Sequence, residues 1–385
     1  MRIGLILYGE LATLTGGYLY DRMVVEGLRG LGHEVTVLPL QAGPYLRRIG
    51  HGLSFGLTRR LLKARFDLIL QDELCHPSLF LVNRRLRALG GPPVVAIVHH
   101  LLSDEPRGRW LNRLLAEPEK RYLASVDGFV FNSRITRRKV ESLVGGERPQ
   151  VVAYPAGDRF ACLPSPEAVA ERACRPGPLQ LLFVGTLIPR KGLHQLIQGL
   201  AEAERGTWQL TVVGDPECAP GYARQAKTLI AQLGLAEAIR FLGPCQEEAL
   251  AGVIGRHHLF SMPYAYEGFG IAILEAMGFG LPAVGSRLGA AGETITHGGN
   301  GFLLAPEDRA GLVGLIQGLH RDRSRLAELS RGALRTFAHR PRWQETTMAI
   351  EGFILELAGR SKAQPLIGAT RPRLEAVVRG VGHAS

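Results

Sequence analysis

Short aliphatic runs alternate with amphipathic stretches of helical length along most of the chain. That alternation is typical of parallel sheets whose strands are joined by crossover helices. In the first half we predict strands at 3–7, 34–38, 67–70, 94–98, 128–131 and 150–153. In the second half we predict them at 179–184, 209–213, 239–242, 258–262, 283–285 and 302–304. The pattern therefore indicates α/β architecture with two doubly wound sheets.

The chain has 385 residues, which is more than one hydrophobic core usually holds. A stretch rich in Pro and Gly, residues 154–178, lies between the two predicted sheets and marks a domain boundary. We place one domain at 1–157 and the other at 158–340. Helical patterns continue to about residue 360, and the tail 361–385 is a candidate for disorder because it has few apolar residues to bury.

The composition of the chain also indicates the cellular compartment in which the protein works. The five cysteines are scattered without the spacing of a metal site, which favours a reducing environment and argues against structural zinc. No stretch reaches the roughly 18 uncharged apolar residues that a membrane-spanning helix needs. We therefore expect a cytoplasmic protein.

The net charge of +11 is concentrated in the first half. Residues 1–157 carry 22 Lys and Arg against 14 Asp and Glu, whereas residues 158–360 balance at 20 against 20. The densest basic segment, 47–65, interleaves basic and apolar residues and has no acid. Such a segment can rest on an anionic membrane surface or form a solvated basic face. Nucleic acid is a weaker alternative, because aromatic residues are only 7 % and no nucleic-acid-binding module is recognisable.

Ligands of doubly wound sheets bind at the carboxyl ends of the strands, so the loops there are the places to look for chemistry. After the first strand, Gly16-Gly17 precedes a helix and can bring backbone amides close to an anion. A plain flexible connector is the alternative. After the fourth strand, His99 and His100 are placed to donate a hydrogen bond or a proton, although a lone histidine here is more often structural.

The first strand of the second half leads into Arg190-Lys191-Gly192, which opens a helix. Cations beside a helix N-terminus form an electrostatic site for a diphosphate, with Lys as a point charge and Arg able to bind in a bidentate manner. The alternative is an ordinary helix start with solvated basic residues.

The most informative stretch runs from Glu267 to Glu275. Gly268-Phe269-Gly270 lets the backbone turn sharply into a helix that carries Glu275 among apolar neighbours. Burying an unpaired carboxylate is costly, so Glu275 must find a partner. Two carboxylates around this helix N-terminus can bind two hydroxyl-bearing groups of one ligand, while amides of the glycine-rich turn hold an anion. A buried structural salt bridge is the alternative for Glu275.

These motifs resemble those of the family-4 retaining glycosyltransferases, the glycosyl transferases group 1, and the likeness covers nearly the whole chain. The Glu267-x7-Glu275 spacing is similar to the family's most specific motif, and the Arg190-Lys191-Gly192 loop is similar to its usual companion. The resemblance implies the GT-B fold, in which two Rossmann-like doubly wound domains face each other across a cleft. The first would bind the acceptor and the second the nucleotide-sugar donor, and the last helix, 341–360, would cross back onto the first domain.

By this resemblance the enzyme is a hexosyltransferase-like protein that moves a sugar from a nucleotide-diphosphate sugar to an acceptor hydroxyl. Catalytic roles fall to Glu267, His99 and Lys191. Donor contacts are expected from Gly16, Gly17, Arg190, Lys191, Cys245, Glu267, Gly268, Phe269, Gly270, Ile271 and Glu275. Lys191 would hold the diphosphate, Glu267 the hydroxyls of the donor sugar, and Glu275 those of the ribose.

One position departs from the family, because many relatives have Arg where this chain has Thr186. We expect Arg190 to supply the missing positive charge. No Asp-x-Asp occurs in the chain, so neither a metal nor another cofactor is expected. Lys191 and helix N-termini would then stabilise the leaving diphosphate. The family's same-face attack through an oxocarbenium-like state fits best, since no carboxylate nucleophile is obvious.

Loops of the first domain determine the acceptor. The basic region 45–66, together with Arg84-Arg85-x-Arg87 and Arg107-x-Arg109, favours a membrane lipid or lipid-linked glycan. The protein would then be peripheral on the inner face of the membrane and serve glycan or glycolipid biosynthesis. A soluble small-molecule acceptor is the alternative. A nucleotide-sugar 2-epimerase and a non-catalytic nucleotide-sugar-binding subunit are rival hypotheses, and the donor motifs argue against both. The base of the donor is not readable, although uridine or guanosine is commonest in the family.

Overall fold

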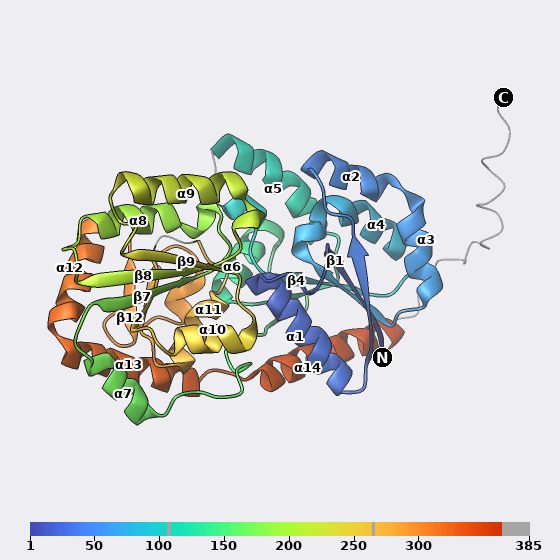
Figure 1. The fold of residues 1–385 in the computed structure, drawn as a ribbon. Helices are drawn as coiled ribbons and strands as arrows, with labels where there is room; N and C mark the ends of the chain where they lie inside the picture. The colour runs from blue at the N-terminus through green and yellow to red at the C-terminus, as the bar shows by residue number, and fades with distance from the viewer. Residues whose placement is uncertain (106–108, 264–265, 364–385) are drawn as a thin grey trace.

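The computed structural model describes residues 1–105, 109–263 and 266–363. It has two α/β domains that lie side by side, with the last helix running beneath the first of them (Figure 1). Arg107, the side chain of Arg109 and the tail after residue 363 lie outside the described residues. The predictions that concern them are therefore not addressed by the structure.

The first domain is built on a six-stranded parallel sheet with the order β2-β1-β3-β4-β5-β6. The strands are β1 (Arg2–Tyr8), β2 (Glu34–Leu40), β3 (Leu68–Asp72), β4 (Val94–Val98), β5 (Gly128–Phe131) and β6 (Gln150–Val152). The helices are α1 (Gly16–Gly30), α2 (Tyr45–Leu53), α3 (Phe55–Ala64), α4 (His76–Ala88), α5 (Arg109–Leu123) and α6 (Arg134–Val144), with 3-10 turns η1 (Glu73–Cys75) and η2 (Leu102–Asp104). Strand β4 is buried along its whole length because helices cover both faces of the sheet.

The second domain has its own six-stranded parallel sheet, with the order β12-β11-β10-β7-β8-β9. The strands are β7 (Leu179–Val184), β8 (Trp208–Val213), β9 (Ile239–Gly243), β10 (Leu259–Met262), β11 (Ala283–Ser286) and β12 (Gly301–Leu304). The helices are α7 (Pro166–Cys174), α8 (Leu193–Ala201), α9 (Pro220–Gln232), α10 (Glu247–Ile254), α11 (Ile271–Gly278), α12 (Arg309–Arg321) and α13 (Arg323–Ala338), with 3-10 turns η3 (Pro189–Lys191), η4 (Pro216–Cys218) and η5 (Ala290–Glu293).

Each predicted strand is present, and its ends lie within two residues of the predicted ones. The prediction of two doubly wound sheets is therefore confirmed. Helix α7, within the Pro- and Gly-rich stretch, was not predicted. It forms because Ser165 caps it by accepting a hydrogen bond from the N–H of Ala168, and because Pro166 occupies the first turn, where a missing N–H costs nothing.

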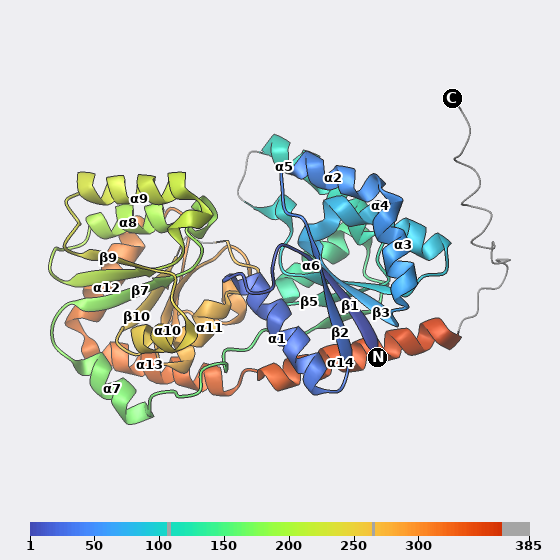
Figure 2. The same ribbon diagram turned by 45° about the vertical axis from the view of Figure 1, so that its right-hand side comes forward.

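The last helix, α14 (Trp343–Ala363), packs on the first domain although it follows the second (Figure 2). Trp343, Ile350 and Ile354 share one buried cluster with β1, α1 and β3. Near the middle of the helix, Glu351 binds Nε2 of His33 at 2.8 Å. The helix thus covers one face of the first sheet.

Among the helices of the described residues, none is long and apolar enough to cross a membrane.

The two domains also contact each other directly. Glu293 of η5 accepts hydrogen bonds from the N–H groups of Arg134 at 3.1 Å and Ile135 at 2.7 Å, in the first turn of α6. The hydroxyl of Tyr154 donates to the same carboxylate at 2.9 Å. A helix N-terminus favours a negative charge, so this carboxylate fastens the second domain to the first.

Candidate active site

A cavity of about 650 Å³ lies between the two domains. The first domain contributes the beginning of α1, and the second contributes residues that follow β7, β8, β9 and β10. These are the carboxyl ends of parallel strands, where doubly wound sheets bind their ligands. The volume is in the range of sites for small organic molecules.

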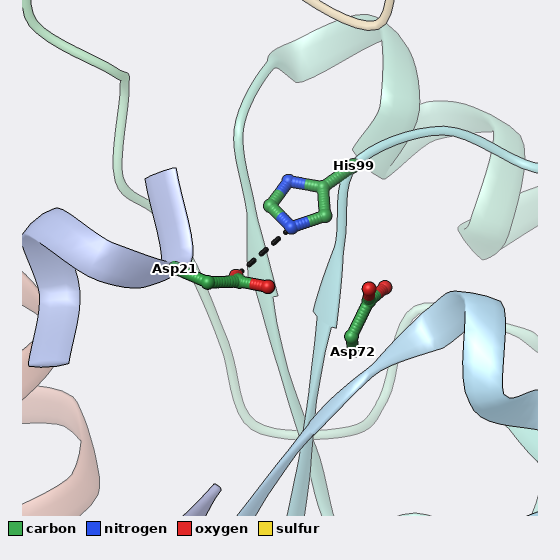
Figure 3. Close-up of side chains that lie close together, drawn as sticks. All are labelled: Asp21, Asp72 and His99. Carbon is green, nitrogen blue, oxygen red and sulfur yellow. Dashed lines mark hydrogen bonds and ion pairs between the residues drawn. The ribbon is translucent and has the colours of Figure 1, made fainter. Parts of the chain in front are cut away.

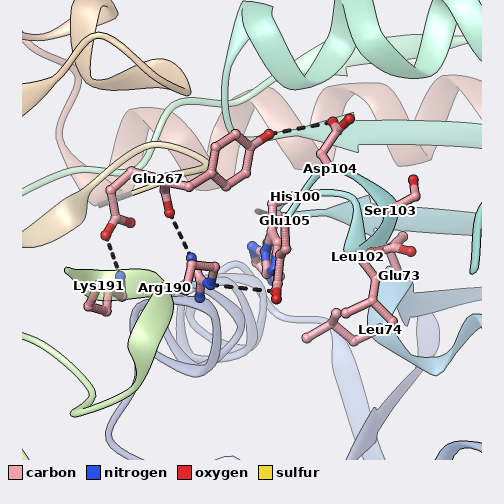
Figure 4. Close-up of polar contacts among 12 residues, drawn as sticks. Glu73, Leu74, His100, Leu102, Ser103, Asp104, Glu105, Arg190, Lys191 and Glu267 are labelled. Atoms are coloured by element: carbon pink, nitrogen blue, oxygen red, sulfur yellow. Dashed lines mark hydrogen bonds and ion pairs between the residues drawn. The ribbon is translucent and has the colours of Figure 1, made fainter. Parts of the chain in front are cut away.

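Lys191 and Glu267 form an ion pair in the wall of this cavity (Figure 4). Lys191 ends the turn η3 after β7, and Glu267 lies in the loop between β10 and α11. Burial by itself raises the pKa of Glu267, but the charges of Lys191 and Arg190 outweigh it and hold the pKa below its ordinary value. The pair therefore presents an ammonium group and an ionised carboxylate side by side to a ligand.

Thr186 lines the cavity, whereas Arg190 points away from it. Nη1 of Arg190 donates to the backbone oxygen of Tyr266 at 2.7 Å, and Nε lies 3.4 Å from Oε1 of Glu105 in the first domain (Figure 4). In this arrangement Arg190 joins the two domains. Its expected contact with a phosphate stays a prediction, and it requires the guanidinium group to leave these partners.

Glu275 is buried on α11 and lines the same cavity. Nε of Arg159 donates to its Oε1 at 2.5 Å, and Nη2 donates to Oε2 at 3.2 Å. Nη1 of Arg159 donates to Oε2 of Glu247 at 3.1 Å. Sequence reasoning required a partner for Glu275 but missed Arg159, because the two residues are 116 positions apart. The salt bridge and a role in ligand binding are compatible, since all three side chains line the cavity.

The glycine-rich turn before α11 contributes both to the contact between the domains and to the wall of the cavity. Gly270 adopts a φ of +90°, which a residue with a side chain rarely adopts, and Gly270 and Ile271 line the cavity. Gly268 instead packs against the backbone oxygen of His99, where a Cβ atom would overlap it. Phe269 is buried in the core of the first domain. The first half of the turn therefore joins the domains, and the second half faces the cavity.

Of the other residues predicted to contact the donor, two line the cavity and one packs against the first domain instead. Gly16 begins α1 and lines the cavity, as does Cys245 after β9. Gly17 lies outside the lining, and a Cβ atom placed there would lie 3.5 Å from the ring of His99. An added methyl group would therefore make only an ordinary van der Waals contact with that ring.

His99 follows β4 but does not line the cavity. Its Nε2 donates to Oδ1 of Asp21 at 3.0 Å, and Asp72 lies beside the pair (Figure 3). Burial by itself lowers the pKa of His99, but the neighbouring carboxylates raise it to about 9. The side chain is therefore a buried imidazolium bound to Asp21, and its predicted catalytic contact stays a prediction.

Two groups of buried side chains in the first domain have the ligand types that metals use. In each group one ligand atom per residue lies within 4.8 Å of the others. The groups are Asp21, Asp72 and His99, and Glu73, His76 and Glu119. Both consist of residues outside the cavity lining, so neither is placed to clamp a diphosphate there. Metal independence is a prediction that these geometries do not test.

Models of two protein families match the chain. The model described as glycosyl transferases group 1 matches residues 166–335, and the model described as glycosyl transferase 4-like domain matches residues 28–157. The two matches fall on the second and the first domain, respectively.

Individual proteins also resemble the chain over most of its length. A glycogen synthase of Mycobacterium tuberculosis is 28 % identical over 328 residues, covering 83 % of this chain and 75 % of the relative. A D-inositol 3-phosphate glycosyltransferase of Nocardia farcinica is 29 % identical over 360 residues, covering 83 % and 79 %. The crystal structure of Anabaena HepE in complex with UDP-glucose has a TM-score of 0.73 at 20 % identity, covering 93 % of this chain and all of that one. The chain has the GT-B fold with a cavity between its two domains. It belongs to the glycosyltransferases that combine a glycosyl transferase 4-like domain with a glycosyl transferases group 1 domain, and it uses nucleotide sugars.

Proposed function

We propose that the protein is a retaining, metal-independent glycosyltransferase that transfers a sugar to a hydroxyl of a membrane lipid or a lipid-linked glycan. The proposal that the cavity binds a nucleotide-sugar donor rests on the charged side chains that line it. Lys191 and Glu267 form an ion pair in the lining, and Glu275 lines the same cavity while bound to Arg159. A nucleotide sugar has its diphosphate between its sugar and its ribose, so Lys191 suits the diphosphate, and Glu267 and Glu275 suit the hydroxyls on either side of it.

The leaving group of the reaction determines which charge the site must stabilise. Departure of a nucleoside diphosphate builds negative charge on its phosphates, and Lys191 with the amides at the start of α11 would stabilise that charge. Glu267 is ion-paired with Lys191, which makes it a poor nucleophile. Attack by the acceptor from the face that the diphosphate leaves, through an oxocarbenium-like state, is then the simplest route, and it retains the configuration of the sugar.

The acceptor part rests on the surface formed by α2 and α3. Leu53 and Phe55 are 62 % and 53 % exposed there, and Arg59, Arg60 and Lys63 are exposed nearby. Apolar groups that enter the headgroup region, combined with cations that attract anionic lipids, favour a membrane surface.

Helix α5 extends the same side of the molecule, because it lies beside α2 in both views (Figures 1 and 2). Its Trp110 and Leu114 are 76 % and 56 % exposed. A Trp favours the membrane interface, where its ring is apolar and its N–H stays wet. The exposed apolar and basic side chains thus come from three helices of the first domain, which is the expected acceptor domain.

A soluble acceptor is the second candidate. The relatives named above are a glycogen synthase and an inositol 3-phosphate glycosyltransferase, and neither name refers to a lipid. In that case the exposed basic residues would form a solvated face.

The donor is tested by thermal shift with uridine, guanosine and adenosine diphosphates and their common sugars, with EDTA present throughout. A ligand that binds the native state raises the melting temperature. A rise with one nucleotide series supports metal-free donor binding and identifies the base. A rise that appears only when magnesium or manganese replaces EDTA contradicts metal independence.

The acceptor surface is tested by flotation with anionic and neutral vesicles at several salt concentrations. We expect salt-sensitive binding to the anionic vesicles, weakened by replacing Arg59, Arg60 and Lys63 with Ser. The matched control replaces Arg321, Arg331 and Arg335 with Ser, because these residues are exposed on the second domain. Equal binding to both kinds of vesicle, or equal loss in both triple variants, contradicts a membrane-bound acceptor at this surface.

A further inference from the structure

Arg159 lies between two carboxylates in the wall of the donor cavity. It belongs to the segment that joins the two domains, and it binds Glu275 on α11 and Glu247 at the start of α10. The three side chains come from different parts of the chain, and all of them line the cavity.

The guanidinium group is held in one orientation. Two of its nitrogens bind the two oxygens of Glu275, and the third binds Glu247, as described above. Its central carbon lies 4.5 Å from the centre of the Phe160 ring, and that ring packs edge-on against Phe279 at 5.2 Å. A planar group fixed by three hydrogen bonds and an aromatic ring loses little further freedom when a ligand binds.

This arrangement determines what Glu275 can still do. Each carboxylate oxygen can accept about two hydrogen bonds, so Arg159 leaves free acceptor capacity on both oxygens. Burial raises the pKa of Glu275 above its ordinary value, and the hydrogen bonds and charge of Arg159 offset only part of this rise, to which the charge of Glu247 also adds. Without the guanidinium group, the carboxyl group would more readily take up a proton and lose part of its capacity to accept hydrogen bonds.

We propose that Arg159 is a positioning residue for the donor, which orients the carboxylate of Glu275 so that it accepts both hydroxyls of a ribose. The proposal rests on the proposed function, because it needs a nucleotide donor in this cavity. The contact of Glu275 with the ribose hydroxyls is already expected from the family resemblance. What the structure adds is Arg159 as the residue on which the preference for free 2′ and 3′ hydroxyls depends.

The experiment compares two probes, uridine diphosphate and its 2′,3′-dideoxy counterpart, by calorimetric titration. Guanosine or adenosine diphosphate and the matching dideoxy compound replace them if the thermal-shift screen selects another base. We expect the wild-type protein to prefer the ribonucleotide by roughly 10- to 100-fold, as for hydrogen bonds to a charged group. Arg159→Gln should reduce this preference to about threefold or less, chiefly by weakening ribonucleotide binding, because the dideoxy compound has no hydroxyl to lose.

Two further variants separate this role from a merely structural one. Arg159→Lys keeps the charge but not the planar fork, so its preference should lie between those of wild type and Arg159→Gln. Glu275→Gln should reduce the preference as Arg159→Gln does, and the double variant should reduce it no further. If Arg159→Gln is poorly folded because two carboxylates are left unpaired, Arg159→Gln combined with Glu247→Gln makes the same measurement. The control Arg309→Gln, at an exposed ion pair on α12, should keep the wild-type preference.

An Arg159→Gln protein that weakens binding of both probes equally, with the preference intact, would overturn the proposal and leave the donor site standing. A wild-type protein that binds none of the three nucleoside diphosphates would overturn the proposed function, and this inference with it.

Discussion

Lys191 is the residue on which the proposed chemistry depends most. Its ammonium group is within the cavity and already bound to Glu267, so it needs no large movement to reach a diphosphate. We expect Lys191→Ala to lower turnover by about 100-fold or more, because a preorganised charge at the leaving group is lost. Release of nucleoside diphosphate measures the effect. Lys227→Ala, an exposed lysine on α9, is the matched control, and wild-type turnover in Lys191→Ala would show that the donor phosphates bind elsewhere.

Glu73 is a buried carboxyl group that the proposed mechanism does not use. Burial raises its pKa to about 8, so the folded protein keeps a proton on it well above the pH at which the unfolded chain releases that proton. A raised carboxyl pKa contributes stability that is complete below about pH 4.5 and is lost as the pH rises towards 8. Near neutral pH the loss amounts to at most about 1.4 kcal/mol per pH unit.

Glu73→Gln removes this titration while keeping nearly the same shape. We therefore expect the variant to gain stability relative to wild type between pH 5 and pH 8, which denaturant unfolding at several pH values measures. Glu119 lies next to Glu73, and its pKa is also raised to about 8 by burial and by the charge of Glu73. A stability difference between variant and wild type that does not change with pH would show that Glu73 is ionised in the folded protein.

At the level of elements, the position of α14 depends on how closely it packs against α1. Gly27 of α1 faces Thr347 of α14, and a Cβ atom at Gly27 would lie 2.9 Å from the Cβ of Thr347 and still closer to its hydroxyl. We expect Gly27→Ala to destabilise the protein by about 1–3 kcal/mol through overpacking. Chemical denaturation of the single and double variants measures this effect.

Thr347→Ala should relieve part of that cost when combined with Gly27→Ala, because the two side chains compete for one space. Gly30→Ala is the control, since nothing lies within 4 Å of its added methyl group and alanine favours a helix. Additive effects of Gly27→Ala and Thr347→Ala would mean that α14 does not pack on α1 in this way.

At the level of the whole molecule, the carboxylate of Glu293 is one of the contacts that hold the two domains together, because it accepts two N–H groups at the start of α6. Glu293→Gln removes the charge that the helix N-terminus favours, at a cost of about 1 kcal/mol. We expect a larger radius of gyration by solution X-ray scattering and donor affinity weakened by roughly fivefold, because both domains line the cavity. Glu328→Gln, within an exposed pair on α13, should change neither quantity. An unchanged radius and affinity in Glu293→Gln would locate the domain contact elsewhere.

The sequence alone determined the two sheets and the strand ends that carry the donor loops. Runs such as 94–98 are short, rich in β-branched residues and apolar at every position, which favours strands covered on both faces. The glycines and charges of the 267–275 motif were also readable, because local backbone geometry and a short spacing define them. Of these motif residues, Glu267, Gly270, Ile271 and Glu275 line the cavity.

Only the tertiary structure decided which charges meet. It pairs Glu275 with Arg159, binds His99 to Asp21 and directs Arg190 to Glu105 in the other domain. Each of these pairs joins residues that are far apart in sequence, and a buried charge takes whichever partner the fold brings near. Sequence patterns report which side chains are buried along one element, whereas the meeting of two elements depends on packing across the whole chain.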